Sequence, residues 1–140
     1  MAQTEKILTR KALLKNLDSF QEFITDCARQ YLLPEDRIFK LQLASEEALM
    51  NIFSYAYPDD APGDVTVRCF HQKTGQLLIS FEDSGEAFDV LCVDDPDTTL
   101  SLEDRDVGGL GIFFMKQMTD AVWYARKENK NILTFRMSLS

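Results

Sequence analysis

An acidic and an amide side chain stand four residues apart in the chain, at Glu47 and Asn51. The surrounding residues 35–57 have helical apolar spacing, so the two side chains should share one helix face about one turn apart. A carboxylate there can accept a proton, and an amide oxygen beside it can bind a divalent metal. The alternative interpretation is two solvated polar residues on a surface helix, and the helix alone does not exclude it.

A first glycine turn follows an expected strand, as Asp83-Ser-Gly85. A carboxylate at the end of a strand can accept a hydrogen bond from an exocyclic amine such as that of adenine. The adjacent glycine would let the base lie close to the backbone. The alternative is an ordinary Asp-Ser-Gly turn.

A second glycine turn directly precedes an expected short helix. It consists of Gly108, Gly109, Leu110 and Gly111. Free N–H groups and the positive end of a helix dipole together favour phosphate. The spacing matches neither G-x-G-x-x-G nor the Walker loop, and a flexible hinge is the alternative. With the acid, the amide and the first turn, this loop predicts a site for ATP and a divalent metal.

The elements that must position these residues follow from periodicity and breakers. Helices are predicted over 17–33, 35–57 and 112–118, and strands over 5–10, 65–71, 76–82, 121–126 and 131–137. Pro34 separates the first two helices, and the Pro/Gly-rich run 58–63 ends the second. The order predicts an α+β fold: a two-layer α/β sandwich, with a mostly antiparallel sheet covered by helices on one face. One domain is expected over residues 1–140.

Composition excludes several classes of function. Fifteen basic and twenty-three acidic residues give a net charge of −8, which argues against nucleic-acid binding. No run of about 18 apolar residues is present, so no membrane span is expected. The first residues lack the order of a signal peptide, and a cytoplasmic location is therefore expected.

Cysteine and histidine are too sparse for metal or nucleophilic centres built on them. Cys27, Cys69 and Cys92 form no C-x-x-C and are odd in number, so we expect buried free thiols in a reducing compartment. His71 is the only histidine, and it lies in an expected strand. A Ser-His-Asp triad would have to use it, which makes such a triad a poor hypothesis.

Taken in order, the motifs resemble those of a known family. Glu47-x-x-x-Asn51, Asp83-x-Gly-x-x-Phe88 and the Gly-Gly-Leu-Gly-Ile of residues 108–112 are similar to the Bergerat-type ATPase fold of gyrase, Hsp90, MutL and histidine kinases. Within that fold the chain looks most like the bacterial anti-sigma-factor serine/threonine kinases. The resemblance covers nearly the whole chain, including the last two expected strands.

The resemblance implies a role for each motif residue. Glu47 would be the general base that activates a serine hydroxyl on a partner, and Asn51 would bind the Mg²⁺ that bridges the ATP phosphates. Asp83 would hold the adenine amino group, with Gly85 beside the ring. Arg105 would contact the γ-phosphate, unless it is a solvated loop arginine. The loop that closes on the phosphates would comprise Gly108, Gly109, Leu110 and Gly111.

The sequence departs from the family pattern at two positions. A histidine is common four residues after the metal-binding asparagine, where this chain has Tyr55. A proline is common before the phenylalanine of the first glycine turn, where this chain has Ala87. Neither change removes a group needed for chemistry, but both bear on nucleotide affinity and on the fit of a partner.

The function implied is a protein serine/threonine kinase that uses ATP and Mg²⁺ in a switch between partners. It would sequester a sigma factor or similar regulator and phosphorylate an anti-sigma factor antagonist, and the resemblance suggests a homodimer. One alternative is a module that binds ATP and sequesters a partner without phosphoryl transfer. Another is a histidine kinase fragment, which would need a phosphoaccepting His on a helical segment; His71 is a poor substitute.

Overall fold

The computed structural model describes residues 5–92 and 109–139. Its single sheet is antiparallel throughout and has the strand order β1-β2-β3-β5-β4. The strands are β1 (Glu5–Lys11), β2 (Asp64–Gln72), β3 (Gln76–Asp83), β4 (Ala121–Lys127) and β5 (Lys130–Ser138). The helices are α1 (Leu17–Gln30), α2 (Glu35–Tyr55) and α3 (Gly109–Met118).

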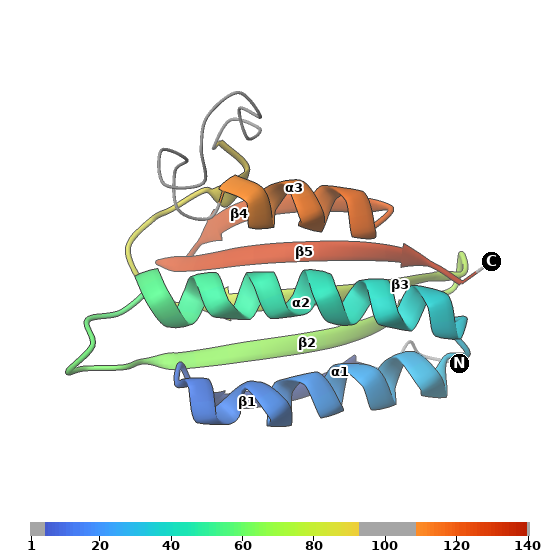
Figure 1. Cartoon of the computed structure of the whole chain (residues 1–140), viewed down its shortest axis with the longest axis horizontal. Coiled ribbons are helices and arrows are strands. Elements are labelled where there is room, and N and C mark those ends of the chain that lie inside the picture. Colours follow the sequence, from blue (N-terminus) through green and yellow to red (C-terminus); the bar gives the residue numbers. More distant parts are fainter. Residues whose placement is uncertain (1–4, 93–108, 140) are drawn as a thin grey trace.

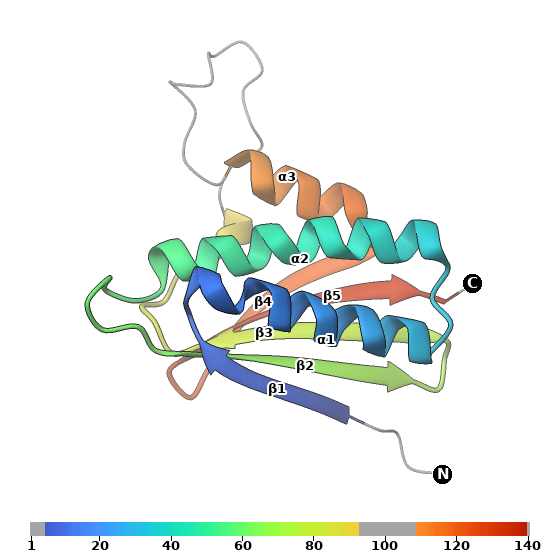
Figure 2. The ribbon, with the colours of Figure 1, turned by 60° about the horizontal axis from the view of Figure 1, so that its bottom comes forward.

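The three helices lie side by side on one face of the sheet (Figures 1 and 2). α2 occupies the middle of this layer, between α1 and α3, and no helix of the described residues lies on the other face of the sheet. The predicted α+β sandwich is therefore confirmed. The central strands β2 and β3 bury every second side chain against the helices, as alternating apolar residues on a half-covered sheet require.

α2 is held in the core by one broad apolar face. Leu41 and Leu49 on that face are fully buried, and Phe81 and Phe135 meet them from the sheet side of the same core. The face follows the three- and four-residue spacing of an amphipathic helix. Pro34 precedes the first turn in extended backbone, which sets where the helix begins.

Two hairpins connect the strands largely as the sequence predicts. β2 and β3 pair from Val65–Asp83 to Gln72–Gln76 around a turn in which Gly75 has a φ of 84°. β4 and β5 pair around Glu128 and Asn129, both of which have positive φ. β3 and β5 also pair with each other, so the end of β3 at Asp83 lies beside the start of β5 at Asn131.

Three helix boundaries differ from the sequence prediction, the smallest difference being that α2, expected to reach residue 57, ends at Tyr55. α1 was expected to reach residue 33, but it ends at Gln30, and Leu32 takes a left-handed φ of 62°. Leu33 then turns into the core, which a continued helix would not allow. α3 was expected to begin at residue 112, but it begins at Gly109, so part of the predicted glycine loop forms the first turn of the helix.

The prediction of free thiols is wrong for two of the three cysteines. Cys27 on α1 and Cys69 on β2 are joined in a disulfide between residues 42 positions apart. Both side chains face the layer between α1 and the sheet and are nearly fully buried. The sequence spacing showed no pairing because packing of a helix on a strand brought the two residues together. Free thiols therefore no longer support the expectation of a reducing compartment.

Candidate functional site

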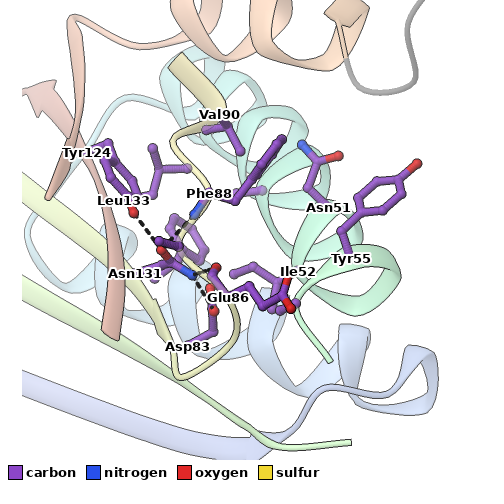
Figure 3. A pocket seen from close by; sticks show the side chains of 14 residues that line it. Asn51, Ile52, Tyr55, Asp83, Glu86, Phe88, Val90, Tyr124, Asn131 and Leu133 are labelled. Carbon is purple, nitrogen blue, oxygen red and sulfur yellow. Dashed lines mark hydrogen bonds between the residues drawn. The ribbon is translucent and has the colours of Figure 1, made fainter. Parts of the chain in front are cut away.

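A cavity of about 390 Å³ opens between the C-terminal half of α2 and the adjoining ends of β3, β4 and β5. The segment Glu86–Val90, which follows β3, forms a further wall (Figure 3). Asn51 and Asp83 both line this cavity. The volume falls in the usual range for sites that bind small molecules, and most of the lining is apolar with a few polar side chains.

The apolar part of the lining comes from side chains of the core. Ile52 of α2, Phe81 of β3, Leu133 of β5 and Val90 contribute to it. A flat apolar group that entered here would leave water and gain contacts with these side chains. The lining therefore suits an aromatic ring such as a nucleobase.

Asp83 is the carboxylate of the cavity, and it is only 6% exposed. Its Oδ1 accepts the backbone N–H of Gly85 at 2.9 Å and the side-chain amide of Asn131 at 2.9 Å. No hydrogen bond to Oδ2 is found among the described residues. The carboxylate is therefore fixed through one oxygen, and the other oxygen can accept a hydrogen bond from a ligand.

Asn131 is the residue of the cavity that the sequence analysis missed. It lies opposite Asp83 in the β3–β5 pairing and is 7% exposed. Its side chain contacts Asp83, Tyr124 and the segment after β3 (Figure 3). The signal that could have found it is the alternation of β5, where an asparagine occupies an inward position in register with buried Leu133 and Phe135.

Gly85 has a packing role that the sequence did not reveal. A Cβ at this position would clash with the backbone carbonyl of Ala56, just beyond the end of α2. Its own carbonyl accepts a hydrogen bond from Arg126 at 2.9 Å. Gly85 is not among the residues that line the cavity. The need for glycine here therefore comes from the close approach of the turn to α2, and contact with an adenine ring stays a prediction.

Tyr57 ties the same turn to the start of β2. Its hydroxyl donates to the carbonyl of Asp64 at 2.7 Å and accepts the N–H of Ser84 at 2.6 Å. Burial raises the pKa of the Tyr57 hydroxyl, against the opposing effect of its bond to Ser84. The turn that carries Asp83 is thus held by side chains from two other segments.

Asn51 lines the cavity from α2, as the motif predicts. Its amide nitrogen is buried and has no hydrogen-bond partner among the described residues. A buried amide without a partner is costly, and a polar ligand in the cavity would remove that cost. The assignment of nitrogen and oxygen in an amide is set by its partners, so either atom can turn to a ligand. This orphaned group fits a phosphate or a metal bound to phosphate.

Glu47 lies one turn before Asn51 but is not among the lining residues. Burial raises the pKa of the Glu47 carboxyl above its ordinary value of 4.5, and the charge of Glu46 adds to the effect. A raised pKa makes the carboxylate a better proton acceptor. The structure therefore places the Glu47 carboxylate outside the cavity lining, one helical turn before Asn51.

Two aromatic side chains border the cavity. Tyr55 on α2 is 52% exposed and Phe88 is 51% exposed, and both are among the lining residues. Figure 3 shows Phe88 close to Asn51, with Tyr55 further along the helix. Tyr55 stands where the family commonly has histidine, so the departure noted in the sequence lies at the site itself.

The second glycine motif is described only in part. Arg105 and Gly108 lie outside the described residues, so their predicted contacts with phosphate stay predictions. Gly109, Leu110 and Gly111 form the first turn of α3, which packs beside α2 (Figure 1). The first N–H groups of a helix have no partner within it, so this turn retains the donors that the phosphate hypothesis requires.

Metal-binding clusters and membrane helices are not found in the described part of the chain. Residues 5–92 and 109–139 contain no group of three or more His, Cys, Asp or Glu side chains that could hold a metal ion. No described helix is both long and apolar enough to cross a bilayer.

Comparison with known proteins identifies the fold family. The histidine kinase-like ATPase domain matches residues 11–137. The serine/threonine-protein kinase BtrW of Bordetella bronchiseptica is 31% identical over 96 residues, which cover 69% of this chain and 67% of that protein. The serine-protein kinase RsbW of Bacillus subtilis is 29% identical over 110 residues, covering 74% of this chain and 64% of RsbW.

A further relative is also a serine-protein kinase. RsbW of Bacillus licheniformis is 33% identical over 93 residues, covering 62% of this chain and 56% of that protein. The match to the ATPase domain spans the three helices and the strands β2 to β5 up to residue 137, and it includes only the last residue of β1. The resemblance drawn from the motifs is therefore confirmed, and ATP is the ligand that the domain implies. This chain belongs to the histidine kinase-like ATPase family and is similar to its bacterial serine/threonine-protein kinases.

Proposed function

We propose that this chain is a serine/threonine protein kinase that uses ATP and Mg²⁺. The observation that carries the proposal is one cavity lined by both Asn51 and Asp83, with a fixed carboxylate at one end and an unpartnered amide at the other. Similarity to three serine or serine/threonine kinases supports phosphoryl transfer as the reaction. Such transfer needs mainly positioning and neutralisation of charge.

In this proposal the two ends of the cavity have separate tasks. Asp83 accepts a hydrogen bond from the adenine amino group through the oxygen that has no protein partner. Asn51 binds the Mg²⁺ through its side-chain oxygen, because oxygen ligands and phosphate are what Mg²⁺ prefers. When bound, the metal offsets the negative charge of the phosphates. The first turn of α3 supplies N–H groups to the phosphates.

Glu47 is the proposed general base. Its raised pKa and its place one helical turn from Asn51 suit removal of the proton from a serine hydroxyl on another protein. The hydroxyl oxygen then bonds to the γ-phosphorus while the bond from that phosphorus to the β,γ-bridging oxygen breaks. ADP leaves, and the phosphoserine stays on the partner.

The proposed partners follow from the resemblance to anti-sigma-factor kinases. The chain would sequester a sigma factor or similar regulator in the cytoplasm and would phosphorylate an anti-sigma factor antagonist, working as a homodimer. A phosphate adds nearly two negative charges at neutral pH. Because this chain has a net charge of −8, phosphorylation should weaken its complex with the antagonist and free it for the regulator.

The test is transfer of label from γ-labelled ATP to a protein captured from the native cell. Wild-type protein should label a serine on a captured partner, and Glu47→Gln should lower the rate by about 10²- to 10⁴-fold, the range for loss of a general base. The affinity of Glu47→Gln for ATP should stay within about threefold, because the residue does not line the cavity. Label that persists at the wild-type rate in this variant would remove Glu47 from the role.

A second function is favoured by one specific observation. Glu47 lies outside the cavity lining, which suits a module that binds ATP and holds a partner without phosphoryl transfer. In that case wild-type protein would bind ATP and retain a partner but would place no label on it. The same labelling experiment separates the two functions.

A further inference from the structure

Asn131 stands at the junction of three elements around the cavity. It pairs with Asp83 across β3 and with Arg126 across β4 in the sheet registers. Its side chain points inward and is nearly fully buried. No motif in the sequence assigns it a task, yet it makes four side-chain hydrogen bonds, more than any other polar side chain of the cavity makes within the described part of the chain.

The hydrogen bonds of Asn131 use its whole capacity. Its Nδ2 group donates to Asp83 Oδ1 at 2.9 Å and to the carbonyl of Glu86 at 2.8 Å. Its Oδ1 accepts the N–H of Phe88 at 3.2 Å and the hydroxyl of Tyr124 at 2.5 Å (Figure 3). A side-chain amide has two donor hydrogens and two acceptor lone pairs, so none is left for a ligand. Any effect of Asn131 on a ligand must therefore act through its neighbours.

The neighbour that matters most is Asp83. Two donors converge on its Oδ1, from Asn131 and from the backbone of Gly85. With Oδ1 taken, rotation of the carboxylate is blocked, and Oδ2 remains as an acceptor without a partner among the described residues. The hydrogen bonds of Asn131 to the backbone of Glu86 and Phe88 also fix the segment after β3 that forms the adjacent wall of the cavity. Asn131 thus sets both the direction of the free acceptor and the position of the wall.

We propose that Asn131 is a positioning residue that sets the preference of the cavity for adenine over guanine. It does so by holding Asp83 with a single acceptor oxygen directed to the ligand. Adenine carries an amino group at the ring carbon where guanine carries a carbonyl oxygen. A fixed carboxylate oxygen pairs with the amino group and repels the carbonyl, so the choice depends on how rigidly it is held. The inference rests on the proposed function, because it takes ATP as the ligand.

The test measures the dissociation constants of Mg·ATP and Mg·GTP by calorimetry for the wild type and for Asn131→Ala. We expect ATP affinity to fall by about 10- to 100-fold, the scale of a lost hydrogen bond to a charged group, and GTP affinity to change much less. The ratio of the two constants should therefore fall by roughly tenfold or more. A ratio that stays at the wild-type value in a folded variant would overturn the proposal.

Two further variants keep the test decisive if Asn131→Ala does not fold. Asn131→Asp keeps the shape but replaces the donating group with an oxygen that faces Asp83, so selectivity should again be lost. Tyr124→Phe keeps the amide and removes one donor to it, so a smaller loss of about threefold is expected. Unchanged selectivity in both variants would overturn the proposal.

The matched control is Thr134→Val on the same strand. Thr134 pairs with Ser80 and Trp123, so it lies on the face of β5 opposite to Asn131, and it does not line the cavity. The substitution should leave both dissociation constants unchanged. If wild-type protein binds neither nucleotide, the proposed function itself fails. If wild-type protein prefers ATP and Asn131→Ala retains that preference, only the role of Asn131 fails.

Discussion

The two ends of the cavity differ in how completely their polar groups are paired. At one end, Asp83 and Asn131 are nearly fully buried and joined in a network that reaches Tyr124 and the segment after β3. At the other end, the amide nitrogen of Asn51 is buried without a partner among the described residues. In the proposed site we call the Asp83 end the base end, because it would hold the nucleobase, and the Asn51 end the phosphate end. The base end is built before a ligand arrives, whereas the phosphate end would be completed by the ligand.

Because of this difference, a substitution should change the free energies of folding and of ligand binding differently at the two ends. A group within the paired network contributes to folding and to binding, because its loss leaves buried partners unsatisfied. A group without a partner contributes to binding alone, since folding gains nothing from it. Stability and affinity should thus change together at the base end and independently at the phosphate end.

The largest expected effect on the free energy of unfolding comes from a disulfide that lies outside the cavity. It provides a case in which stability changes and ATP affinity does not. The Cys27–Cys69 disulfide closes a loop over a sequence separation of 42, and its loss should lower the free energy of unfolding by about 4 kcal/mol on the chain-entropy model. ATP affinity should stay the same, because neither cysteine lines the cavity. Guanidinium unfolding with and without reductant, beside calorimetry with Mg·ATP, measures both quantities.

The control for this prediction is the double variant Cys27→Ala and Cys69→Ala. Its stability should not respond to reductant, whereas that of the wild type should. A thiol titration that finds both cysteines free in the isolated protein would contradict the disulfide and restore the prediction made from the sequence.

At the base end, Asp83→Ala should lower both stability and affinity. The substitution leaves the N–H of Gly85 and the amide of Asn131 without an acceptor, at a cost of about 1–3 kcal/mol for buried groups. ATP affinity should fall by at least about tenfold. Urea unfolding and calorimetry measure the two effects, and the exposed Asp59→Ala, in the turn after α2, should change neither. A loss of affinity without a loss of stability would refute the idea that this end is prebuilt.

As the proposed general base, Glu47 should make phosphoryl transfer sensitive to pH. A general base acts when deprotonated, and the pKa of Glu47 is raised above 4.5 by burial and by the charge of Glu46. The rate of phosphoryl transfer should therefore fall as pH decreases through this raised pKa, approaching about tenfold per pH unit below it. Because the charge of Glu46 contributes to the shift, Glu46→Gln should move the acidic limb of the profile to lower pH. A limb that does not move would assign the titration to another group.

The smallest effect on folding is expected at Asn51. Its amide nitrogen has no partner to lose, and its burial without a partner is costly, so Asn51→Ala should not lower the free energy of unfolding in the absence of ligand and should even raise it. The affinity for Mg·ATP should nevertheless fall, and the loss should vanish when Mg²⁺ is removed. Asn131→Ala is the matched comparison, because the same substitution there should be clearly destabilising. Equal destabilisation by the two variants would abolish the distinction between the ends.

Much of the fold could be predicted from local pattern. Strand alternation, helical spacing and the breakers Pro34 and Gly75 placed the elements to within a few residues. One exception is the end of α1. Where α1 ends and where Leu33 lies depend on side-chain packing in the core. No residue near the end of the helix signals this in the sequence.

The candidate site was predicted less completely. The motifs predicted one site for Asn51 and Asp83, and both line one cavity, but the motifs could not reveal Asn131, which carries no local signal beyond an inward polar position. Gly85 was assigned to the ligand, yet the structure shows that the carbonyl of Ala56 already requires a glycine. Both points depend on segments that are distant in sequence and adjacent in space.

The sequence by itself determined which residue types stand at helical, strand and turn spacings, and from them the family and the candidate chemistry. Those properties depend on neighbours within a few positions, where backbone geometry makes spacing predictive. Only the tertiary structure decided that Cys27 meets Cys69, that Asn131 holds Asp83, and that Asn51 has no protein partner. Such pairings arise when the helix layer packs on the sheet, because burial selects the partners of polar groups and spacing along the chain does not record them.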